Sequence, residues 1–410
     1  MASEQVVVGL DVGTTKICTL IGEVKGPRQI EVVGVGISPS RGLKKGLIVD
    51  MDEAAVAIAT SIRKAETYSG YRIIGGFVAL SGGHIDSEIA HGIIRLPGDR
   101  AVSRQELKQV EDASRLEDFL EGGRHVLHVM PMGYIVDGES GVQNPVGMRA
   151  TTLEAESLVV TSAISPLQNL ARCIERAGLQ IDGFVASGLA SSHGVLTDTE
   201  KQLGVLLMDI GGGTTDLVWY REGEVEYVAA LPIGGNHLTN DLAVGLGVPF
   251  SAAEEMKVRF ASAVPDNVEP NETIEADSFS DGEPRKISRR FMAEIVEARL
   301  SEIFSLVQEE LSRHRFEGVL PGGIVMTGGT AQLRGVRELV ELTFHMPARV
   351  GHPDGLIGTI ESITTPGYAT GAGLLKWVVA QSGDGVGSRQ MRKRVDWGSR
   401  LKGIVKIFFP

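Results

Sequence analysis

The chain has 410 residues, of which 42% are hydrophobic, 22% charged and 5% aromatic, and its formal net charge is −12 at pH 7. This length and composition predict a soluble globular protein with two to four compact units. The acidic balance and the low aromatic content argue against a general nucleic-acid-binding protein.

The cysteine count and the hydropathy pattern exclude further classes. Two cysteines, Cys18 and Cys173, are too few for a disulfide framework, and we expect both to be buried and reduced. The first residues show no basic region followed by an apolar run, and no run of about 18 apolar residues occurs anywhere. We therefore expect no secretory signal, no membrane-spanning helix and a protein that stays in the cytosol.

Two strands around a Gly/Thr-rich loop are predicted first along the chain. The apolar runs at 6–10 and 17–21 are typical of buried strands, and Asp11-Val12-Gly13-Thr14-Thr15-Lys16 joins them. Apolar residues at helical spacing then predict a helix at 52–67, behind an acidic start.

An interruption follows this first unit. Residues 84–161 carry alternating strand-like runs and one polar helix, at 104–120, which together indicate an inserted subdomain. His125 and His128 lie close together here, but no carboxylate or cysteine completes a metal site, so we interpret them as structural. Helical spacing resumes at 166–177, before Gly178.

The opening pattern returns nearly 200 residues later. Apolar runs at 205–208 and 217–220 flank the loop Asp209-Ile210-Gly211-Gly212-Gly213-Thr214-Thr215-Asp216. Internal self-similarity of this kind indicates a duplicated structural unit. It predicts two similar α/β domains, each opening with a hairpin whose tip is rich in glycine and threonine.

A third glycine-rich loop is predicted in the second half of the chain. Residues 263–288 contain three prolines and many polar residues, which favours a mobile loop or a hairpin, and 289–313 has the pattern of a long amphipathic helix. Residues 322–330 then read as a strand with glycines on both sides, before a helix expected at 331–342.

The composition changes abruptly after Lys376. Residues 381–388 are rich in glycine and serine, which predicts a flexible tether, and 389–410 hold seven Lys or Arg residues against one acid. Apolar residues recur there at helical spacing, with cations on the other side. This pattern predicts an amphipathic helix in the interface of an anionic membrane, through Trp397, Arg400, Leu401, Lys402, Ile404, Val405, Lys406, Phe408 and Phe409.

The Gly/Thr-rich loops have the chemistry of a phosphate site. Glycine lets backbone N–H groups approach phosphate oxygens, threonine hydroxyls add donors, and Lys16 supplies a point charge. Asp11 and Asp209 each end a strand and could hold Mg²⁺ through its waters. Neither loop is a Walker A motif, because no GxxxxGK[ST] sequence occurs. Three such loops in this order resemble the actin-like superfamily, in which a nucleotide lies between two domains.

Within that superfamily the chain resembles the FtsA family over nearly its whole length. The insert around NPVGMRATTLE (144–154) is the most specific part of the resemblance, because it resembles the subdomain that FtsA proteins carry in place of the one in actin. Further family-like stretches are DVGTTK (11–16), GLKKGLIVDMDEA (42–54), LSGGHI (80–85), DIGGGTTD (209–216), PIGGNHLTNDLA (232–243), AEEMK (253–257), GGIVMTGGTAQLRG (322–335) and TPGYATGAGLLKW (365–377).

The resemblance implies a fold and a division of the chain. The fold is an α/β, actin-like one, a duplicated ribonuclease H-like architecture of two domains, with an FtsA-type inserted subdomain and a C-terminal amphipathic helix. The first domain would comprise 1–83 and 165–202 around the insert at 84–164, and a return helix at 365–380. The second domain would comprise 203–240 and 315–364, with a subdomain at 241–314, and a basic linker at 381–393 would precede the helix at 394–410.

The loops and the resemblance together give a set of candidate nucleotide-binding residues. By the resemblance, Glu255 and Lys257 would contact the ribose or base, and Gly235 and Asn236 the phosphates. The full set is Asp11, Gly13, Thr14, Thr15, Lys16, Asp209, Gly211, Gly212, Gly213, Thr214, Thr215, Gly234, Gly235, Asn236, Glu255, Lys257, Gly328, Gly329 and Thr330.

Hydrolysis has no obvious catalyst in the sequence. Actin relatives that hydrolyse ATP place Gln or Glu near the start of the helix after the strand at 181–186, whereas this chain has Ala186-Ser187-Gly188-Leu189. No general base for water can therefore be named, and we expect slow hydrolysis or none.

The resulting hypothesis is an ATP-binding and Mg²⁺-binding scaffold at the division site, on the cytoplasmic face of the membrane. The resemblance implies that it forms filaments and binds the C-terminal peptide of FtsZ, with other division proteins as further possible partners. Alternatives with the same fold are a sugar or acetate kinase, a pilus-assembly protein and a chaperone-type ATPase. None of these three accounts for both the insert and the basic tail.

Overall fold

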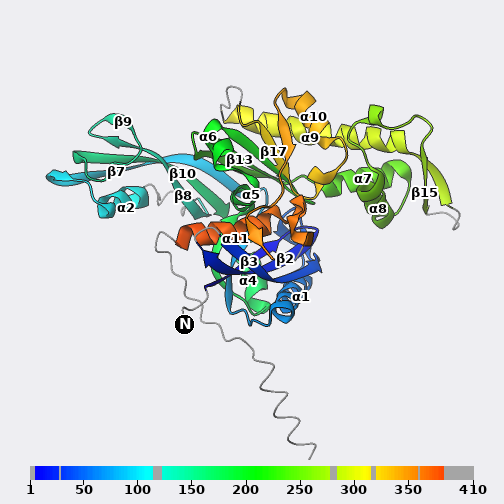
Figure 1. Ribbon diagram of the computed structural model, residues 1–410, viewed down its shortest axis with the longest axis horizontal. Coiled ribbons are helices and arrows are strands. Elements are labelled where there is room, and N and C mark those ends of the chain that lie inside the picture. The colour runs from blue at the N-terminus through cyan, green and yellow to red at the C-terminus, as the bar shows by residue number, and fades with distance from the viewer. Residues whose placement is uncertain are drawn as a thin grey trace, which may run out of the picture.

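The computed structural model describes residues 5–26, 29–113, 122–277, 284–314, 320–358 and 361–382. The expected membrane helix and nearly all of the linker before it lie outside these residues, as does the end of the polar helix expected at 104–120. The described helices include none that is long and apolar enough to cross a membrane. Figure 1 shows a central body with one arm on either side.

The first domain is built on a six-stranded mixed sheet. Its order is β11-β6-β1-β2-β3-β19, in which β1 runs antiparallel to β2 and parallel to β6. The strands are β1 (Val6–Val12), β2 (Lys16–Gly26), β3 (Gln29–Pro39), β6 (Gly75–Leu80), β11 (Gln180–Ala186) and β19 (Leu356–Ile357). Both strands of the hairpin expected at 6–10 and 17–21 are therefore present, each longer than its apolar run.

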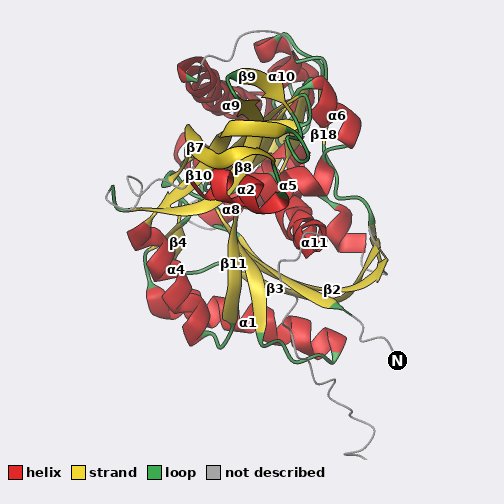
Figure 2. Ribbon diagram, turned by 90° about the vertical axis from the view of Figure 1, so that its left-hand side faces the viewer, coloured by secondary structure: helices red, strands yellow, loops and turns green. Residues whose placement is uncertain are grey.

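Helices cover both faces of this sheet (Figure 2). Along β1, Val6 and Val8 belong to the core shared with α1 (Met51–Ser69) and α4 (Ile164–Arg176), whereas Val7 belongs to the core shared with α11 (Ala369–Ser382). This alternation follows from the two-residue period of a strand, and both faces are apolar because both are covered. α5 (Ser187–Val195) packs closely on α11.

Helix α1 shows why this part of the sequence is helical. The carboxylate of Asp50 accepts hydrogen bonds from the backbone N–H groups of Asp52 and Glu53, which caps the first turn. Gly70 ends the helix in the left-handed conformation. The helix lies so close to β3 that a Cβ on Gly36 would be 1.9 Å from the Ser61 carbonyl oxygen.

The second domain repeats the arrangement of the first. Its sheet has the order β14-β13-β12-β17-β18, and β12 runs antiparallel to β13 and parallel to β17, as β1 does with β2 and β6. The structure therefore confirms the duplication. The strands are β12 (Val205–Ile210), β13 (Thr215–Arg221), β14 (Glu224–Leu231), β17 (Ile324–Thr327) and β18 (Ala348–Val350), with α6 (Asp198–Leu203) leading in.

The helix expected at 331–342 differs from its prediction. A 3-10 turn, η2 (Thr330–Gln332), comes first, and the helix α10 (Val336–Phe344) begins only after Gly335. Gly335 has a φ of +76°, a left-handed conformation that interrupts the helix and that apolar periodicity does not reveal.

The insert forms the left arm of Figure 1. Its sheet has the order β7-β10-β8-β9, and the helix α2 (Arg104–Ala113) packs on it. The strands are β7 (Ile85–Ala101), β8 (Arg124–Val136), β9 (Glu139–Val142) and β10 (Arg149–Ala163). At its base the insert contacts the second domain, because the Ser87 hydroxyl bridges the carbonyl and the N–H of Val228 on β14, at 2.7 and 3.0 Å.

The right arm is a helical subdomain of the second domain (Figure 1). It contains α7 (Gly235–Leu246), α8 (Phe250–Phe260) and α9 (Arg289–Arg313). Between α8 and α9, where a mobile loop or a hairpin is expected, β15 (Thr273–Asp277) pairs antiparallel with β16 (Pro284–Ser288). Shorter elements elsewhere are β4 (Leu43–Lys44), β5 (Leu47–Ile48), η1 (Pro265–Asn267), η3 (Glu361–Thr364) and η4 (Pro366–Tyr368).

Candidate nucleotide site between the domains

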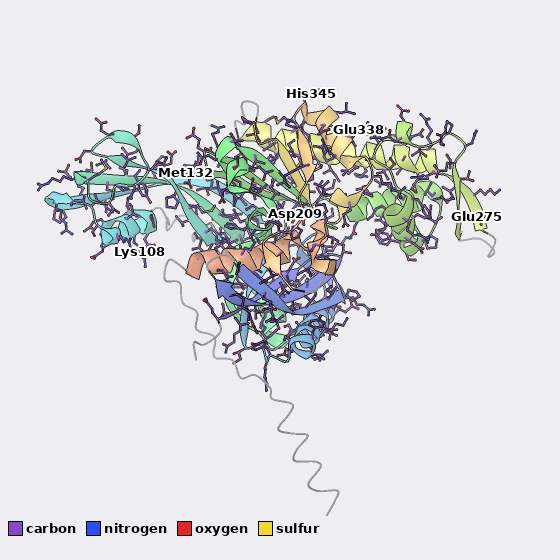
Figure 3. The ribbon with its side chains drawn as sticks, viewed as in Figure 1. Lys108, Met132, Asp209, Glu275, Glu338 and His345 are labelled. Carbon is purple, nitrogen blue, oxygen red and sulfur yellow. The ribbon has the colours of Figure 1, made fainter. Side chains whose placement is uncertain are left out.

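A cavity of about 440 Å³ lies where the two repeated hairpins face each other. The loop between β1 and β2, the loop between β12 and β13, and the loop after β17 all contribute to its walls. Asp209, at the end of β12, lies near the middle of the molecule in Figure 3. The sequence repeat therefore places its two copies on opposite walls of one cleft.

Most of the candidate residues line this cleft. The hairpin loops and the third loop contribute backbone N–H groups, hydroxyls and carboxylates, which is the donor set that a polyphosphate with a divalent cation requires. The candidates in the lining are Asp11, Gly13, Thr14, Thr15, Lys16, Asp209, Gly211, Gly212, Thr214, Gly235, Asn236, Lys257, Gly328, Gly329 and Thr330.

Three other candidates lie just behind the residues that line the cleft and hold the lining loops in place. Thr215 is fully buried, and its hydroxyl donates to the carbonyl of Ile233 at 2.9 Å. A Cβ on Gly234 would lie 2.6 Å from the carbonyl oxygen of Gly211, and one on Gly213 would lie 2.5 Å from the Thr14 hydroxyl. These positions hold the loops in contact, and at the two glycines no larger residue fits.

Glu255 is the candidate that the structure places elsewhere. It is exposed and forms an ion pair with Arg259 at 2.7 Å, whereas Glu254 lines the cleft. The reason is the helical period of α8: Glu254 is three residues before Lys257 and shares its face, while Glu255 is two residues before it and does not. The structure thus places Glu254, and not Glu255, in the lining of the cleft, while a contact of either residue with nucleotide stays a prediction.

Lys257 joins α8 to the start of α7. Its ammonium donates to the Glu254 carboxylate at 2.7 Å, to the Thr239 hydroxyl at 2.9 Å and to the Gly235 carbonyl at 3.2 Å. The Thr239 hydroxyl also donates to Glu254. Because Lys257 is 7% exposed and fully partnered, it fixes this wall of the cleft and leaves the other Glu254 oxygen able to accept a hydroxyl.

Three carboxylates line the cleft: Asp209 and Asp216 are buried, and Asp11 is partly buried. Asp209 accepts hydrogen bonds from Ser191 on α5 and, at 3.0 Å, from Thr370 on α11. Asp216 accepts one at 2.7 Å from Ser81, which lies on the first domain, so this bond crosses between the domains. Burial raises the pKa of Asp209, and raises that of Asp216 well above its ordinary range with Asp209 adding to the shift.

Asp11 completes this group and shows the same effect. Burial raises its pKa to about 7, the nearby charge of Lys16 opposes the shift and that of Asp209 adds to it. Three carboxylates that repel one another in a site of low polarity favour binding of a cation. The described residues hold no group of three or more His, Cys, Asp or Glu side chains placed to hold a metal ion by themselves. The carboxylates in the cleft are compatible with a hydrated Mg²⁺ that also binds a phosphate, and Asp11 and Asp209 remain the predicted residues for it.

Sequence reasoning missed several residues of the lining. Asp216 closes the second loop motif, so its position was a usable signal. Ser81 and Thr370 come from the end of β6 and from α11, where no phosphate-loop pattern marks them. The other missed residues in the lining are Val12, Ser187, Glu254, Val258, Gln332, Leu333, Pro366 and Gly367.

The stretch expected to lack a water-activating residue does line the cleft. Ser187, at the start of α5, is part of the wall. No acid or amide occurs from Ala186 to Leu189. That this stretch supplies no general base for water stays a prediction.

Two α/β sheets of one repeated topology, meeting at a cleft between their hairpin loops, define an actin-like protein. Solved structures share this fold: a PilM–PilN type IV pilus biogenesis complex (17% identity, 91% of this chain and 98% of that chain, TM-score 0.65) and MreB5 of Spiroplasma citri bound to ADP (16% identity, 93% and 99%, TM-score 0.50). At these identities the likeness concerns the fold alone.

Sequence relatives give the family. The family models described as Cell division protein FtsA and as SHS2 domain inserted in FTSA match residues 206–373 and 82–161. The chain is 42% identical to Cell division protein FtsA of Pseudomonas aeruginosa, over 94% of this chain and 92% of that protein, and 34% identical to that of Escherichia coli K12, over 98% and 96%. The chain belongs to the FtsA family of cell division proteins. The kinase, pilus and chaperone alternatives are not favoured.

Proposed function

We propose that this protein binds ATP with Mg²⁺ in the interdomain cleft and serves as a polymerising scaffold that tethers the FtsZ ring to the cytoplasmic face of the membrane at the division site. The observation that carries the proposal is the pairing of two Gly/Thr-rich hairpins across one cleft. Two loops on separate domains can hold one polyphosphate only when the domains are closed around it. Bound nucleotide would therefore favour one domain arrangement over others, which is the property a regulated scaffold needs.

In this proposal the residues of the cleft have separate tasks. The glycine-rich loops bind the phosphates through their N–H groups, and Lys16 neutralises phosphate charge. Asp11 and Asp209 orient the hydrated Mg²⁺, and Glu254 with Lys257 forms the wall for the ribose or base. With no base at 186–189, the nucleotide acts mainly as a conformational ligand, and hydrolysis is slow or absent.

Asp209→Ala tests the nucleotide site. Its removal takes away a carboxylate that orients Mg²⁺, and we expect MgATP to bind 10–100-fold more weakly or not at all. Isothermal titration calorimetry on the full chain measures this directly, and Glu255→Ala, at an exposed position outside the cleft, is the control. Unchanged affinity in Asp209→Ala, or no binding of MgATP to the wild type, would contradict the proposal.

The tether rests on the residues after 388. Their seven basic residues and their apolar face fit an anionic lipid surface, each cation contributing on the order of 1 kcal/mol near that surface. One such helix binds reversibly, so attachment should strengthen when subunits assemble side by side. Co-sedimentation with anionic liposomes, with and without MgATP, compares the full chain with a chain ending at Ser388. Equal lipid binding by both would rule out the anchor.

The partner would be the C-terminal peptide of FtsZ, bound by the helical subdomain at 241–314. Fluorescence anisotropy of the labelled peptide, with a scrambled peptide as control, tests this pairing on the full chain. Filament formation is tested by electron microscopy on lipid monolayers with and without MgATP. Equal anisotropy of both peptides, or the absence of filaments under every condition, would count against the corresponding part of the proposal.

A further inference from the structure

Lys16 lies on an aromatic ring inside the cleft. Its ammonium nitrogen is 3.2 Å from the centroid of the Tyr368 ring, which is well within the range of a cation–π interaction. Among the residues that the structure describes, none has a carboxylate within 4.0 Å of this nitrogen to form an ion pair. The ring is therefore the close partner of a cation that belongs to the predicted phosphate site.

The backbone around Tyr368 is fixed by the third loop. The carbonyl of Pro366 accepts hydrogen bonds at 3.2 Å from both the Gly328 N–H and the Thr327 hydroxyl, and the Tyr368 N–H donates to the carbonyl of Thr365 at 3.0 Å. Helix α11 begins at the next residue, Ala369. Tyr368 thus lies where the chain leaves the second domain for the first, and its ring extends back to a lysine on the first domain.

Gly367 leaves room for this contact. A Cβ at that position would be 3.2 Å from the Lys16 ammonium nitrogen, so any side chain there would crowd the cation. The 3-10 turn η4 therefore presents a bare backbone at Gly367 and an aromatic face at Tyr368, and the ammonium lies against both.

The surrounding charges would move the ammonium if the ring were absent. Asp11 and Asp209 line the same cleft as Lys16, and opposite charges in one cleft attract each other. A lysine chain is long and flexible enough to fold onto either one. An ion pair there would occupy both the cation meant for phosphate and a carboxylate meant for the metal.

We propose that Tyr368 is a positioning residue for Lys16, and that its ring keeps the ammonium in the cleft free to bind nucleotide phosphate and clear of Asp11 and Asp209. This inference rests on the proposed nucleotide-binding function and adds a residue to it. The tyrosine hydroxyl takes no part, because the contact is to the face of the ring. A phenylalanine should therefore replace Tyr368, and an aliphatic residue should not.

The test measures MgATP affinity in the full chain by calorimetry. Tyr368→Leu should weaken binding three- to tenfold, the range expected from loss of a partly buried cation–π contact, and Tyr368→Phe should restore affinity to within about twofold. Tyr68→Leu, at an exposed tyrosine on α1, is the matched control and should bind as the wild type does. Wild-type affinity in Tyr368→Leu would overturn the inference.

A double-substitution comparison separates positioning from a general structural effect. In a Lys16→Met background no ammonium remains to be positioned, so adding Tyr368→Leu should change MgATP affinity less than twofold. If Tyr368→Leu weakens MgATP binding as much in the Lys16→Met background as in the wild type, the inference is overturned, because the effect would then not depend on Lys16.

A spectroscopic measurement gives a readout that needs no nucleotide. The ε-methylene protons of Lys16 should be shifted upfield by the ring in ¹H–¹³C spectra of the wild type and of Tyr368→Phe, and should return to the ordinary lysine position in Tyr368→Leu. The signal is assigned by its loss in Lys16→Arg. An unshifted resonance in the wild type would overturn the inference. Failure of the wild type to bind MgATP, with this shift present, would instead contradict the proposed function.

Discussion

Gly212 and Gly213 are the residues at which the two hairpin loops meet. A Cβ on Gly212 would be 2.0 Å from the Thr15 hydroxyl, and one on Gly213 would be 2.5 Å from the Thr14 hydroxyl. Glycine is needed here for close approach between two loops and not for a left-handed turn, because neither residue has a positive φ. The triple glycine of the second loop thus has a packing reason that a single loop would not reveal.

Gly212→Ala should damage the site more than the fold. The methyl group would push Thr15 aside and separate the loops, so we expect MgATP affinity to fall at least about tenfold. The free energy of unfolding should fall by about 1–3 kcal/mol at most. Gly133→Ala is the control, because a Cβ there meets no atom within 4 Å. Calorimetry and urea unfolding measure both effects. Equal affinities in the two variants would show that the loops tolerate separation.

His128, which we interpreted from the sequence as structural, makes contacts between the insert and the first domain. Its Nε2 accepts the backbone N–H of Ala186 at 3.1 Å, and its ring lies 5.5 Å from that of Trp377. Burial lowers its pKa to about 4. The imidazole is therefore neutral in the folded protein and joins the insert to the strand that precedes α5.

This histidine should make stability depend on pH. The pKa of this imidazole is 6.5 in the unfolded chain and about 4 in the folded protein, so the unfolded state binds the proton first as the pH falls. The free energy of unfolding should therefore decrease as the pH drops from about 6.5 to about 4. His128→Gln should reduce the slope there by up to about 1.4 kcal/mol per pH unit. Urea unfolding at pH 5 and pH 7 measures the difference, and identical slopes in both proteins would contradict it.

At the scale of single elements, α8 provides a matched pair of substitutions. Glu254 faces the cleft beside Lys257, and Glu255 faces solvent beside Arg259. Glu254→Ala should weaken MgATP binding roughly tenfold, because it removes an acceptor and a partner of Lys257. Glu255→Ala should change it less than twofold, since exposed ion pairs contribute little. Calorimetry measures both affinities. A larger loss of MgATP affinity in Glu255→Ala than in Glu254→Ala would mean that the other face of α8 contacts the nucleotide.

The packing of α1 on β3 gives a second prediction at this scale. A methyl group on Gly36 would overlap the Ser61 carbonyl oxygen at 1.9 Å, so the helix would have to move. We expect Gly36→Ala to destabilise the protein by about 1–3 kcal/mol, measured by urea unfolding. Gly133→Ala should be near neutral in the same assay, and a neutral Gly36→Ala would mean that α1 shifts at little cost.

The sequence predicted the elements whose signals are local. Strand–loop–strand patterns revealed both hairpins, because apolar runs and Asp-Gly-Thr loops are contiguous in the chain. The register of a helix is less visible, as Glu255 shows: a motif names neighbouring residues, but only the axis of α8 decides which of them faces the cleft. The break at Gly335 was missed because its apolar flanks suit a continuous helix.

Contacts between distant segments were beyond sequence reasoning. Ser81 donates a hydrogen bond to Asp216, 135 residues further along the chain, and Thr370 donates one to Asp209, 161 residues before it. Serine and threonine occur throughout the chain, so neither residue stands out until the fold brings it to a carboxylate. The repeat predicted that the loops would face each other, and the fold supplied the hydroxyls that pair with their acids.

At the scale of the whole molecule, one ligand should protect distant segments together. MgATP that touches loops on both domains should slow hydrogen exchange at the loop after β1, the loop after β12 and the loop after β17 in parallel. Hydrogen–deuterium exchange on the full chain measures this, and Asp209→Ala should abolish it. Protection confined to one domain would mean that the nucleotide does not bridge the cleft.

The hydrogen bonds between Ser87 and Val228 have a mechanical consequence. The insert emerges from the first domain, yet its base is fastened to the edge strand of the second, and its far end lies well away from both (Figure 1). A rigid arm pivoting on a short fulcrum magnifies small rotations at its tip. A slight opening or closing of the interdomain cleft would therefore displace the outer end of the insert further than its base.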